Sequence, residues 1–155
     1  MRTALAFGWD GAFLLPGCAD PFNEKAIRAS RGACFKIPVE SGDIGDWLEI
    51  CNAHGLTRIA ATSSSTKTDL RPHHENTHLE TYDWERFKEC SASLVLGSEG
   101  QGLSDAVLGL CNPVSIPMVG AMESLNVASA GAILMCVLSH SIKRLMSDLT
   151  LVMEE

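Results

Sequence analysis

Short apolar runs alternate with helical patterns along most of this chain. Segment 44–54 places Ile44, Trp47 and Cys51 on one side of a helix, whereas 93–96 is a brief apolar run typical of a buried strand. The same reading predicts helices over 3–7, 23–29, 44–54, 104–110 and from about 125 onward, and strands over 11–15, 34–39, 58–61, 93–96 and 114–116. This alternation predicts an α/β fold with a mostly parallel sheet and helices on both faces.

Polar and glycine residues mark the expected ends of these elements. Asn23, Asp43 and Ser104 stand where an N-cap side chain accepts a hydrogen bond from the first helical turn. Gly8 and Gly55 are expected to end the helices that precede them. The polar segment 63–82 predicts a variable loop or lid, and 83–88 predicts one or two helical turns.

The composition indicates one globular domain. The chain has 155 residues, of which 46% are hydrophobic, and this excludes a disordered protein. Its six cysteines are widely spaced without a C-x-x-C pair, so we expect reduced core thiols rather than disulfides or a zinc site. The apolar run 130–138 is too short to span a bilayer. With no targeting segment visible, we expect a cytoplasmic or organellar protein (mitochondrion or plastid) and no membrane partner.

The charge pattern contains one feature against nucleic-acid binding and one in favour of it. The net charge of −7 opposes long-range attraction to a polyanion. Segment 24–36, however, has four basic side chains against one acidic one. Composition alone favours a solvated surface there. The basic residues are Lys25, Arg28, Arg31 and Lys36.

The most informative stretch is 94–104, Leu-Val-Leu-Gly-Ser-Glu-Gly-Gln-Gly-Leu-Ser. An apolar strand leads into a turn with three glycines, and Ser104 then begins a helix. Such a strand, turn and helix form a ligand site at the carboxyl end of a strand in α/β proteins. The turn has neither the G-x-G-x-x-G order nor the lysine of the common nucleotide motifs. A second polar turn, Glu-Ser-Leu-Asn-Val-Ala-Ser-Ala, follows at 123–130.

Together these two segments resemble the second and third motifs of the SpoU (TrmH-like) RNA 2′-O-ribose methyltransferases, part of the knotted SPOUT superfamily. Ile116-Pro117-Met118 stands between them in the family's order. Residues 2–8 resemble the back half of the first motif, and 20–33 the stretch after the second strand. The first motif normally opens with an asparagine and a glycine before its arginine. We therefore expect residues 1–155 to be a single SpoU-type domain that lacks the first strand and the start of that motif.

The resemblance implies a fold and an activity. The fold would carry a C-terminal deep trefoil knot, an exception to the usual unknotted topology. The activity would be methyl transfer from S-adenosylmethionine to a ribose 2′-hydroxyl of RNA, with ribosomal RNA expected ahead of transfer RNA. A homodimer is expected through the last helix, which is apolar around much of its circumference. The alternative is a catalytically inactive remnant of the same fold that acts as an RNA-binding or dimerisation module.

The resemblance also assigns residues. The expected donor contacts are Thr62, Leu96, Gly97, Ser98, Ile116, Met118, Ser124 and Leu125. The expected catalytic residues are Arg2, Glu99 and Asn126, and the expected RNA contacts are Lys25, Arg28, Ser30 and Arg31. Because arginine is normally always protonated, electrostatic stabilisation of the alkoxide is an alternative to a role for Arg2 as a base. Taken singly, each residue also suits an ordinary core or turn position, and Asn126 or Ser124 can equally cap the last helix.

The histidines are not expected to bind a metal. Segment 72–78 contains His73, His74, His78 and Glu75, which superficially resembles a ligand cluster. It lacks the H-E-x-x-H arrangement, and its flanks are polar and loop-like. We interpret it as a solvated loop and predict no metal site.

Overall fold

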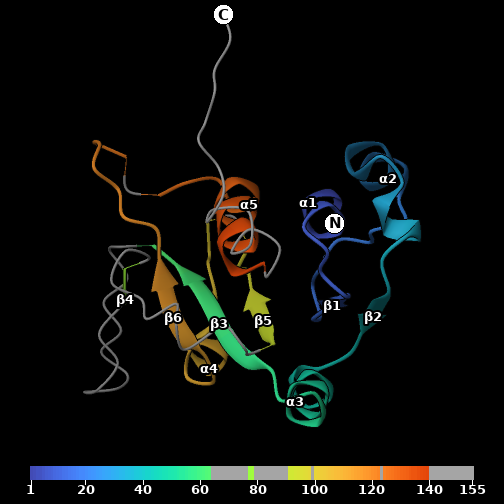
Figure 1. Cartoon of the computed structure of the whole chain (residues 1–155), viewed down its shortest axis with the longest axis horizontal. Coiled ribbons are helices and arrows are strands. Elements are labelled where there is room, and N and C mark those ends of the chain that lie inside the picture. Colours follow the sequence, from blue (N-terminus) through green and yellow to red (C-terminus); the bar gives the residue numbers. More distant parts are fainter. Residues whose placement is uncertain (64–76, 79–90, 99, 123, 140–155) are drawn as a thin grey trace, which may run out of the picture.

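The computed structural model describes residues 1–63, 77–78, 91–98, 100–122 and 124–139 (Figure 1). The predicted turns over 83–88 and most of the predicted loop over 63–82 lie outside these residues. In chain order the elements are α1 (Arg2–Ala6), β1 (Ala12–Leu14), α2 (Glu24–Ser30), the 3₁₀ helix η1 (Ala33–Phe35), β2 (Val39–Ser41), α3 (Ile44–Ala53), β3 (Thr57–Thr62), β4 (Thr77–His78), β5 (Ala92–Val95), α4 (Asp105–Leu108), β6 (Asn112–Ser115) and α5 (Val127–Leu138).

All paired strands are parallel, as predicted. β3 lies between β5 and β6, and the four-stranded sheet has the order β4-β6-β3-β5. Ile59 pairs with Leu94 on one side and with Asn112 on the other, which sets the register at the centre of the sheet. β1 and β2 form a separate two-stranded sheet, a division that the hydrophobic pattern does not predict. Short β4 was also not predicted.

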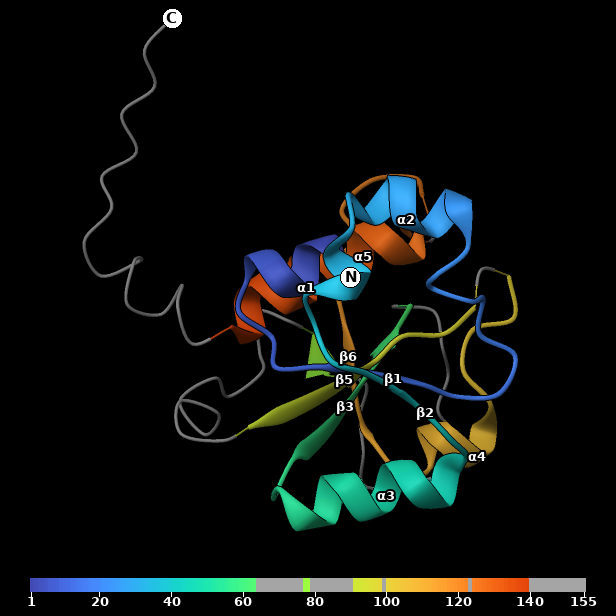
Figure 2. The same cartoon turned by 90° about the vertical axis from the view of Figure 1, so that its right-hand side faces the viewer.

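Helices cover both faces of the four-stranded sheet, which confirms the predicted layers (Figures 1 and 2). Successive side chains of a strand point to opposite faces, so Ile59 and Ala60 of β3 enter different cores. Ala60 joins a cluster with residues of α3, α4 and β5, whereas Ile59 packs with residues of β6 and α5. The first core consists of Trp47, Cys51, Ala60, Val95, Val107 and Cys111; the second consists of Ile59, Val114, Leu134 and Leu138.

The predicted helix caps are confirmed. Asn23 Oδ1 accepts the amide of Ala26 at 2.9 Å. At the start of α3, Asp43 accepts the amide of Asp46 at 3.0 Å, and the Asp46 carboxylate accepts the Asp43 amide at 2.8 Å, which completes a capping box. Ser104 Oγ accepts the amide of Val107 at 3.4 Å at the start of α4. Each cap satisfies an amide that the helix itself leaves unpaired.

The predicted strand over 34–39 is wrong. Arg31 and Gly32 both take left-handed backbone conformations, with φ of 52° and 74°, and turn the chain into η1. The apolar residues Ala33 and Cys34 are buried there by a single tight turn rather than by a strand. β2 begins only at Val39, after a proline that has no amide hydrogen to donate. α4 is also shorter than predicted and ends at Leu108.

Most of the described thiols are core residues, as predicted. Cys34, Cys51 and Cys111 are buried and free, whereas Cys18 is exposed, contrary to expectation. Cys90 lies outside the described residues. Among the residues that the structure describes, no helix has the length and apolar character needed to cross a bilayer.

Candidate active site

A cavity lies at the carboxyl edge of the four-stranded sheet. Because β5, β3 and β6 are adjacent and parallel, the segments that follow them meet at one edge. The inner side of α5 and the segment before it complete the wall. The lining residues are Ala61, Thr62, Ser63, Gly97, Ser98, Gly102, Ile116, Met118, Ser124, Leu125, Val127, Ala130 and Leu134.

The glycine-rich turn closes tightly on itself beside this cavity. The Ser98 amide donates to the Gly102 carbonyl at 3.2 Å, and the Gly102 amide donates back to the Ser98 carbonyl at 3.1 Å. A β-carbon on Gly97 would lie 2.6 Å from the carbonyl oxygen of Gly102 and 2.8 Å from the amide nitrogen of Leu103. Gly100 and Gly102 have φ of 91° and 69°, which favours glycine. The turn therefore requires its glycines for its own conformation, whatever ligand it faces.

The start of α5 forms the opposite wall. Asn126 is the N-cap, and its Oδ1 accepts the Ala128 amide at 2.8 Å. Of the two cap candidates, Asn126 is therefore the one that the structure shows. Asn126 is not among the lining residues, whereas its neighbours Leu125 and Val127 are. The capped turn thus fixes the position of two residues at the mouth of the cavity.

Of the two expected donor contacts Thr62 and Leu96, only Thr62 lines the cavity. The Thr62 hydroxyl donates to the Val114 carbonyl at 3.4 Å, which joins β3 to β6 at the edge of the cavity. Leu96 is not a lining residue. Its Cδ1 would lie 2.7 Å from a β-carbon placed on Gly131, so its side chain packs closely against α5. A side chain on Gly131 would push Leu96 away, which explains why α5 has a glycine here.

The described wall of the cavity is uncharged. Its thirteen residues are apolar, small or hydroxyl-bearing, with no lysine, arginine, aspartate or glutamate among them. Such a surface suits an aromatic base and an aliphatic chain better than a phosphate group, which binds where positive charge or grouped amides are available. It also contains no side chain that titrates near neutral pH.

Of the expected catalytic residues, the two that the structure describes, Arg2 and Asn126, do not line the cavity. Arg2 is exposed at the first position of α1 and is not among the lining residues. Glu99 lies outside the described residues. Within the described part of one chain, the structure therefore assembles the expected donor surface but brings no acid–base group to it.

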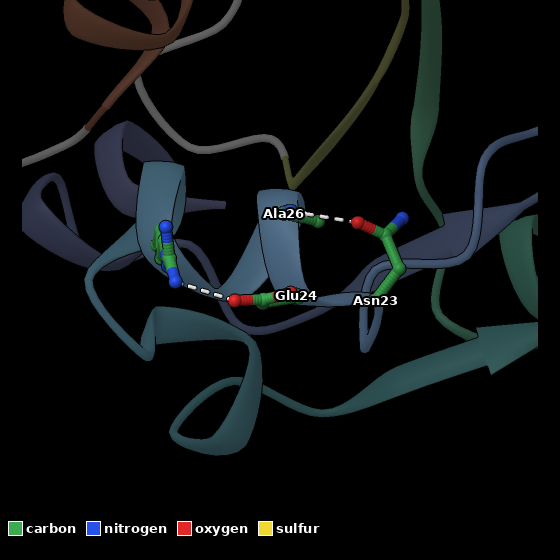
Figure 3. A network of polar contacts seen from close by, with 4 residues as sticks. Asn23, Glu24 and Ala26 are labelled. Atoms are coloured by element: carbon green, nitrogen blue, oxygen red, sulfur yellow. Dashed lines mark hydrogen bonds and ion pairs between the residues drawn. The ribbon is translucent and has the colours of Figure 1, made fainter.

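The expected RNA-contacting residues lie on α2 or, in the case of Arg31, at its C-cap, and they differ in exposure. Lys25, Arg28 and Arg31 are exposed, and Arg28 forms an ion pair with Glu24 one helical turn earlier (Figure 3). Ser30 differs from the expectation: it is buried, and its hydroxyl donates to the Ile27 carbonyl at 3.2 Å and lies 3.6 Å from the Cys34 sulfur. Its hydroxyl therefore ties α2 to η1 instead of facing a substrate.

Several lining residues were not predicted. Ala61 and Ser63 adjoin Thr62 in the sequence, and Gly102 belongs to the same glycine-rich turn as Gly97 and Ser98, so a wider choice around each motif would have included them. Val127, Ala130 and Leu134 recur at the three- and four-residue spacing of one helix face. Since α5 is apolar nearly all round, its pattern alone does not show which side faces the cavity.

Two buried thiols lie in the core formed by α3, α4 and the sheet. Burial raises the pKa of the Cys111 thiol to about 11, with Arg58 acting in the opposite direction. Burial also raises the pKa of Cys51, while a hydrogen bond with Ser93 lowers it. Both thiols therefore stay protonated at neutral pH, when they are poor nucleophiles and poor metal ligands. The described residues contain no group of three or more metal-ligating side chains, and His73, His74 and Glu75 lie outside them.

A parallel sheet covered on both faces, with a cavity beyond its carboxyl edge, places the chain in the α/β class, whose members commonly bind ligands at this edge. The chain belongs to the SpoU rRNA Methylase family, whose pattern matches residues 1–136. It is 33% identical over 135 residues to RlmP, a 23S rRNA guanosine 2′-O-methyltransferase of Bacillus subtilis, and 31% identical over 135 residues to a 23S rRNA uridine 2′-O-methyltransferase of Streptomyces viridochromogenes. These alignments cover 86% and 84% of this chain but 49% and 43% of the relatives, so the chain spans about half their length.

Solved structures show the same likeness. AviRb, a SpoU methyltransferase of Streptomyces viridochromogenes in complex with AdoMet, is 28% identical with a TM-score of 0.71, over 94% of this chain and 54% of that one. An AdoMet-bound rRNA methyltransferase from Sinorhizobium meliloti is 25% identical with a TM-score of 0.72, over 91% of this chain and 49% of that one. The family resemblance inferred from the two glycine- and serine-containing turns is therefore confirmed.

Proposed function

We propose that this chain binds S-adenosylmethionine in the cavity and transfers its methyl group to a ribose 2′-hydroxyl of RNA. One observation supports this most. Of the eight residues expected to contact the donor, seven line one cavity, although they come from three separate segments of the chain. The uncharged wall suits the adenine ring and the aliphatic part of this donor.

S-adenosylmethionine supplies a methyl carbon on a positively charged sulfur. The 2′-oxygen forms a bond to that carbon as the carbon–sulfur bond breaks, and the hydroxyl proton must leave to a base or to water. Because the described wall has no titratable group, help for the alkoxide has to come from outside it. We assign this role to the Arg2 guanidinium, as a positive charge rather than a base. Since Arg2 is exposed, bound RNA or a second chain must bring acceptor and guanidinium together.

The substrate class is RNA, ribosomal ahead of transfer RNA. Both named relatives methylate ribosomal RNA, and the exposed cations of α2 provide phosphate contacts on a chain that is otherwise acidic. Lys25, Arg28 and Arg31 are the residues we assign to this contact. Arginine and lysine at such sites act mainly through phosphate, which gives affinity without sequence preference.

We further propose a homodimer through α5 and the segment before it, with the C-terminal region threaded as a trefoil knot as in the family. Val119, Met122, Leu125 and Ile133 are exposed apolar residues along this part of the chain. Burial of these side chains by a second subunit would remove apolar area from water. Sedimentation at several concentrations tests this, and a monomer mass throughout would contradict it.

The inactive-module alternative is supported by Arg2, which is not among the residues that line the cavity. The deciding experiment combines a calorimetric titration with S-adenosylmethionine and transfer of labelled methyl to total RNA. Ala130 lines the cavity, and Ala130→Leu should fill it and weaken donor binding at least tenfold. Ala128, exposed on the same helix, gives the matched control Ala128→Leu, which should bind like the parent. Donor binding without transfer would favour the inactive module, and equal donor affinity for both variants would refute the placement.

A further inference from the structure

We propose that an aromatic pair beside α2 is a stacking surface for bases of single-stranded RNA. The proposal rests on the proposed function and extends it to RNA that flanks the methylated ribose. The surface, called here the α2 platform, consists of Phe22, Phe35, Lys25, Arg28, Arg31 and Lys36.

The two phenyl rings are presented to solvent as a pair. Phe22 is 46% exposed and Phe35 is 66% exposed. Their centroids are 5.6 Å apart and their planes differ by 40°, within the range of interacting aromatic rings. The other aromatic side chains for which the structure gives exposure, such as Phe13 and Trp47, are partly or fully buried. An exposed pair of this kind therefore differs from the rest of the described surface.

The local backbone holds both rings outward. The Phe22 amide donates to Asp20 Oδ1 at 2.8 Å in the turn before α2, so the position of this residue is fixed. Phe35 ends η1, where its neighbour Cys34 and nearby Ile37 are buried. With these residues anchored in the core, Phe35 faces the opposite way. The backbone on either side of the rings is therefore held by a hydrogen bond and by buried neighbours, and this favours a defined orientation of the rings.

The sequence around the two rings is rich in positive charge. Four basic residues and one acidic residue occur between positions 24 and 36 of a chain whose net charge is −7. The acid, Glu24, pairs with Arg28, but the two side chains are 77% and 79% exposed, so water competes strongly with the pair (Figure 3). A phosphate group can therefore replace Glu24 as the partner of Arg28.

Arg31 adds a separate indication. It ends α2 in the left-handed region with φ of 52°. Glycine is the residue that adopts this conformation without steric cost. A bulky side chain there is uncommon and points to a use for the guanidinium. Arg31 lies between Phe22 and Phe35 in the sequence, and single-strand binding sites combine such cations with aromatic side chains on which bases stack.

The location fits an RNA that also enters the cavity. α2 lies at the upper end of the molecule in both views, the end toward which β3, β5 and β6 point (Figures 1 and 2). The local excess of positive charge favours a polyanion such as RNA as the partner. Single-stranded RNA presents unstacked bases and phosphates side by side, which matches the rings and cations.

The test is the affinity of the full chain for a fluorescent single-stranded RNA and for an abasic RNA of the same length. Phe35→Leu and Phe22→Leu should each weaken binding of the base-containing RNA by about 5- to 150-fold. Binding of the abasic RNA should stay nearly unchanged. Phe35→Trp should bind as tightly as the parent because it keeps a flat aromatic face. Phe13→Leu, the same change at a partly buried ring of β1, is the matched control.

Salt dependence separates stacking from charge. Lys36→Gln should lower the slope of log affinity against log salt by about 0.7, the amount for one phosphate on a single strand. Phe35→Leu should leave that slope unchanged. If Phe35→Leu binds both RNAs as the parent does, the stacking role is wrong. A change in its sedimentation mass with unchanged RNA affinity would instead make the platform a protein interface and overturn the proposal.

The outcome is independent of catalysis, because these measurements need no methyl donor. A parent chain that fails to bind S-adenosylmethionine yet prefers base-containing RNA through Phe35 would support the platform and refute the proposed function. A parent chain that transfers methyl groups, together with a Phe35→Leu variant that keeps full RNA affinity, would support the proposed function and refute the platform.

Discussion

The indole N–H of Trp47 donates a hydrogen bond to the hydroxyl oxygen of Ser93 at 3.0 Å and so ties α3 to β5. Trp47 is 5% exposed, so water cannot readily replace this acceptor. Because β5 leads directly into the glycine-rich turn, the bond helps to hold the strand from which one wall of the cavity extends.

Ser93→Ala should therefore destabilise the protein. It leaves the buried indole N–H without its acceptor, which costs about 1–3 kcal/mol of unfolding free energy. Urea unfolding measures the loss. Ser91→Ala, at an exposed position just before β5, is the matched control and should change stability by less than about 0.5 kcal/mol. Equal stability of the two variants would contradict the role of the bond.

Alkaline pH should weaken the fold through Cys111. Its pKa is raised from 9.0 to about 11 in the folded protein, so the unfolded chain loses this proton first as the pH rises. The stabilising contribution is complete below pH 9 and declines as the pH approaches about 11, by about 1.4 kcal/mol for each unit of pKa difference. Denaturation at several pH values should show a flatter decline for Cys111→Ala, whereas Cys18→Ala, at an exposed thiol, should follow the parent.

Gly97→Ala should damage the turn even without a ligand. A β-carbon would press on the backbone of Gly102 and Leu103, and such overpacking typically costs about 1–3 kcal/mol. Gly120→Ala, where no atom lies within 4 Å of an added β-carbon, should be nearly neutral. Thermal unfolding compares them. Loss of donor binding in Gly97→Ala would therefore not locate the donor, which is why Ala130→Leu is the sharper test.

Asn126 combines a helix cap with an expected role at the substrate. Asn126→Ala should cost about 1 kcal/mol of stability, and Asn126→Ser should restore most of it because serine also caps. If Asn126→Ser restores stability but not methyl transfer, the amide contacts the substrate. Recovery of both stability and methyl transfer would show that Asn126 acts only as the helix cap.

Arg2→Ala should abolish methyl transfer while leaving donor affinity nearly unchanged, since Arg2 is assigned to the acceptor and its phosphates. Arg2→Lys should rescue little, because a point charge does not reproduce the planar guanidinium. Transfer assays and calorimetry on the same preparations separate the two effects. Full activity of Arg2→Ala would move the catalytic role to Glu99 or Asn126.

Local chemistry made much of the fold predictable. Asn23, Asp43 and Ser104 were recognised because capping depends on a side chain and the next few amides alone. The prediction of a strand over 34–39 was wrong because a buried strand and a buried 3₁₀ turn both need apolar residues. The deciding feature, a left-handed conformation at Arg31, is one that sequence rarely signals for a residue other than glycine.

The candidate site was predictable where it follows the strands. Thr62, Gly97 and Ile116 end or follow β3, β5 and β6, so parallel order alone brings them to one edge. Ala130 and Leu134 were missed because their selection depends on how α5 is rotated against the sheet. The inward position of Ser30 was missed for a similar reason, since its burial depends on the fold of η1 against α2.

The indole of Trp9 donates to the Met135 carbonyl at 3.3 Å, a contact between residues 126 positions apart. At a synthesis rate of about 5–20 residues per second, Trp9 leaves the ribosome roughly 6 to 25 seconds before its partner. During that time the apolar surface that later meets α5 has no native cover. Trp9 and the elements around it therefore cannot complete their native contacts until the last described helix has been made.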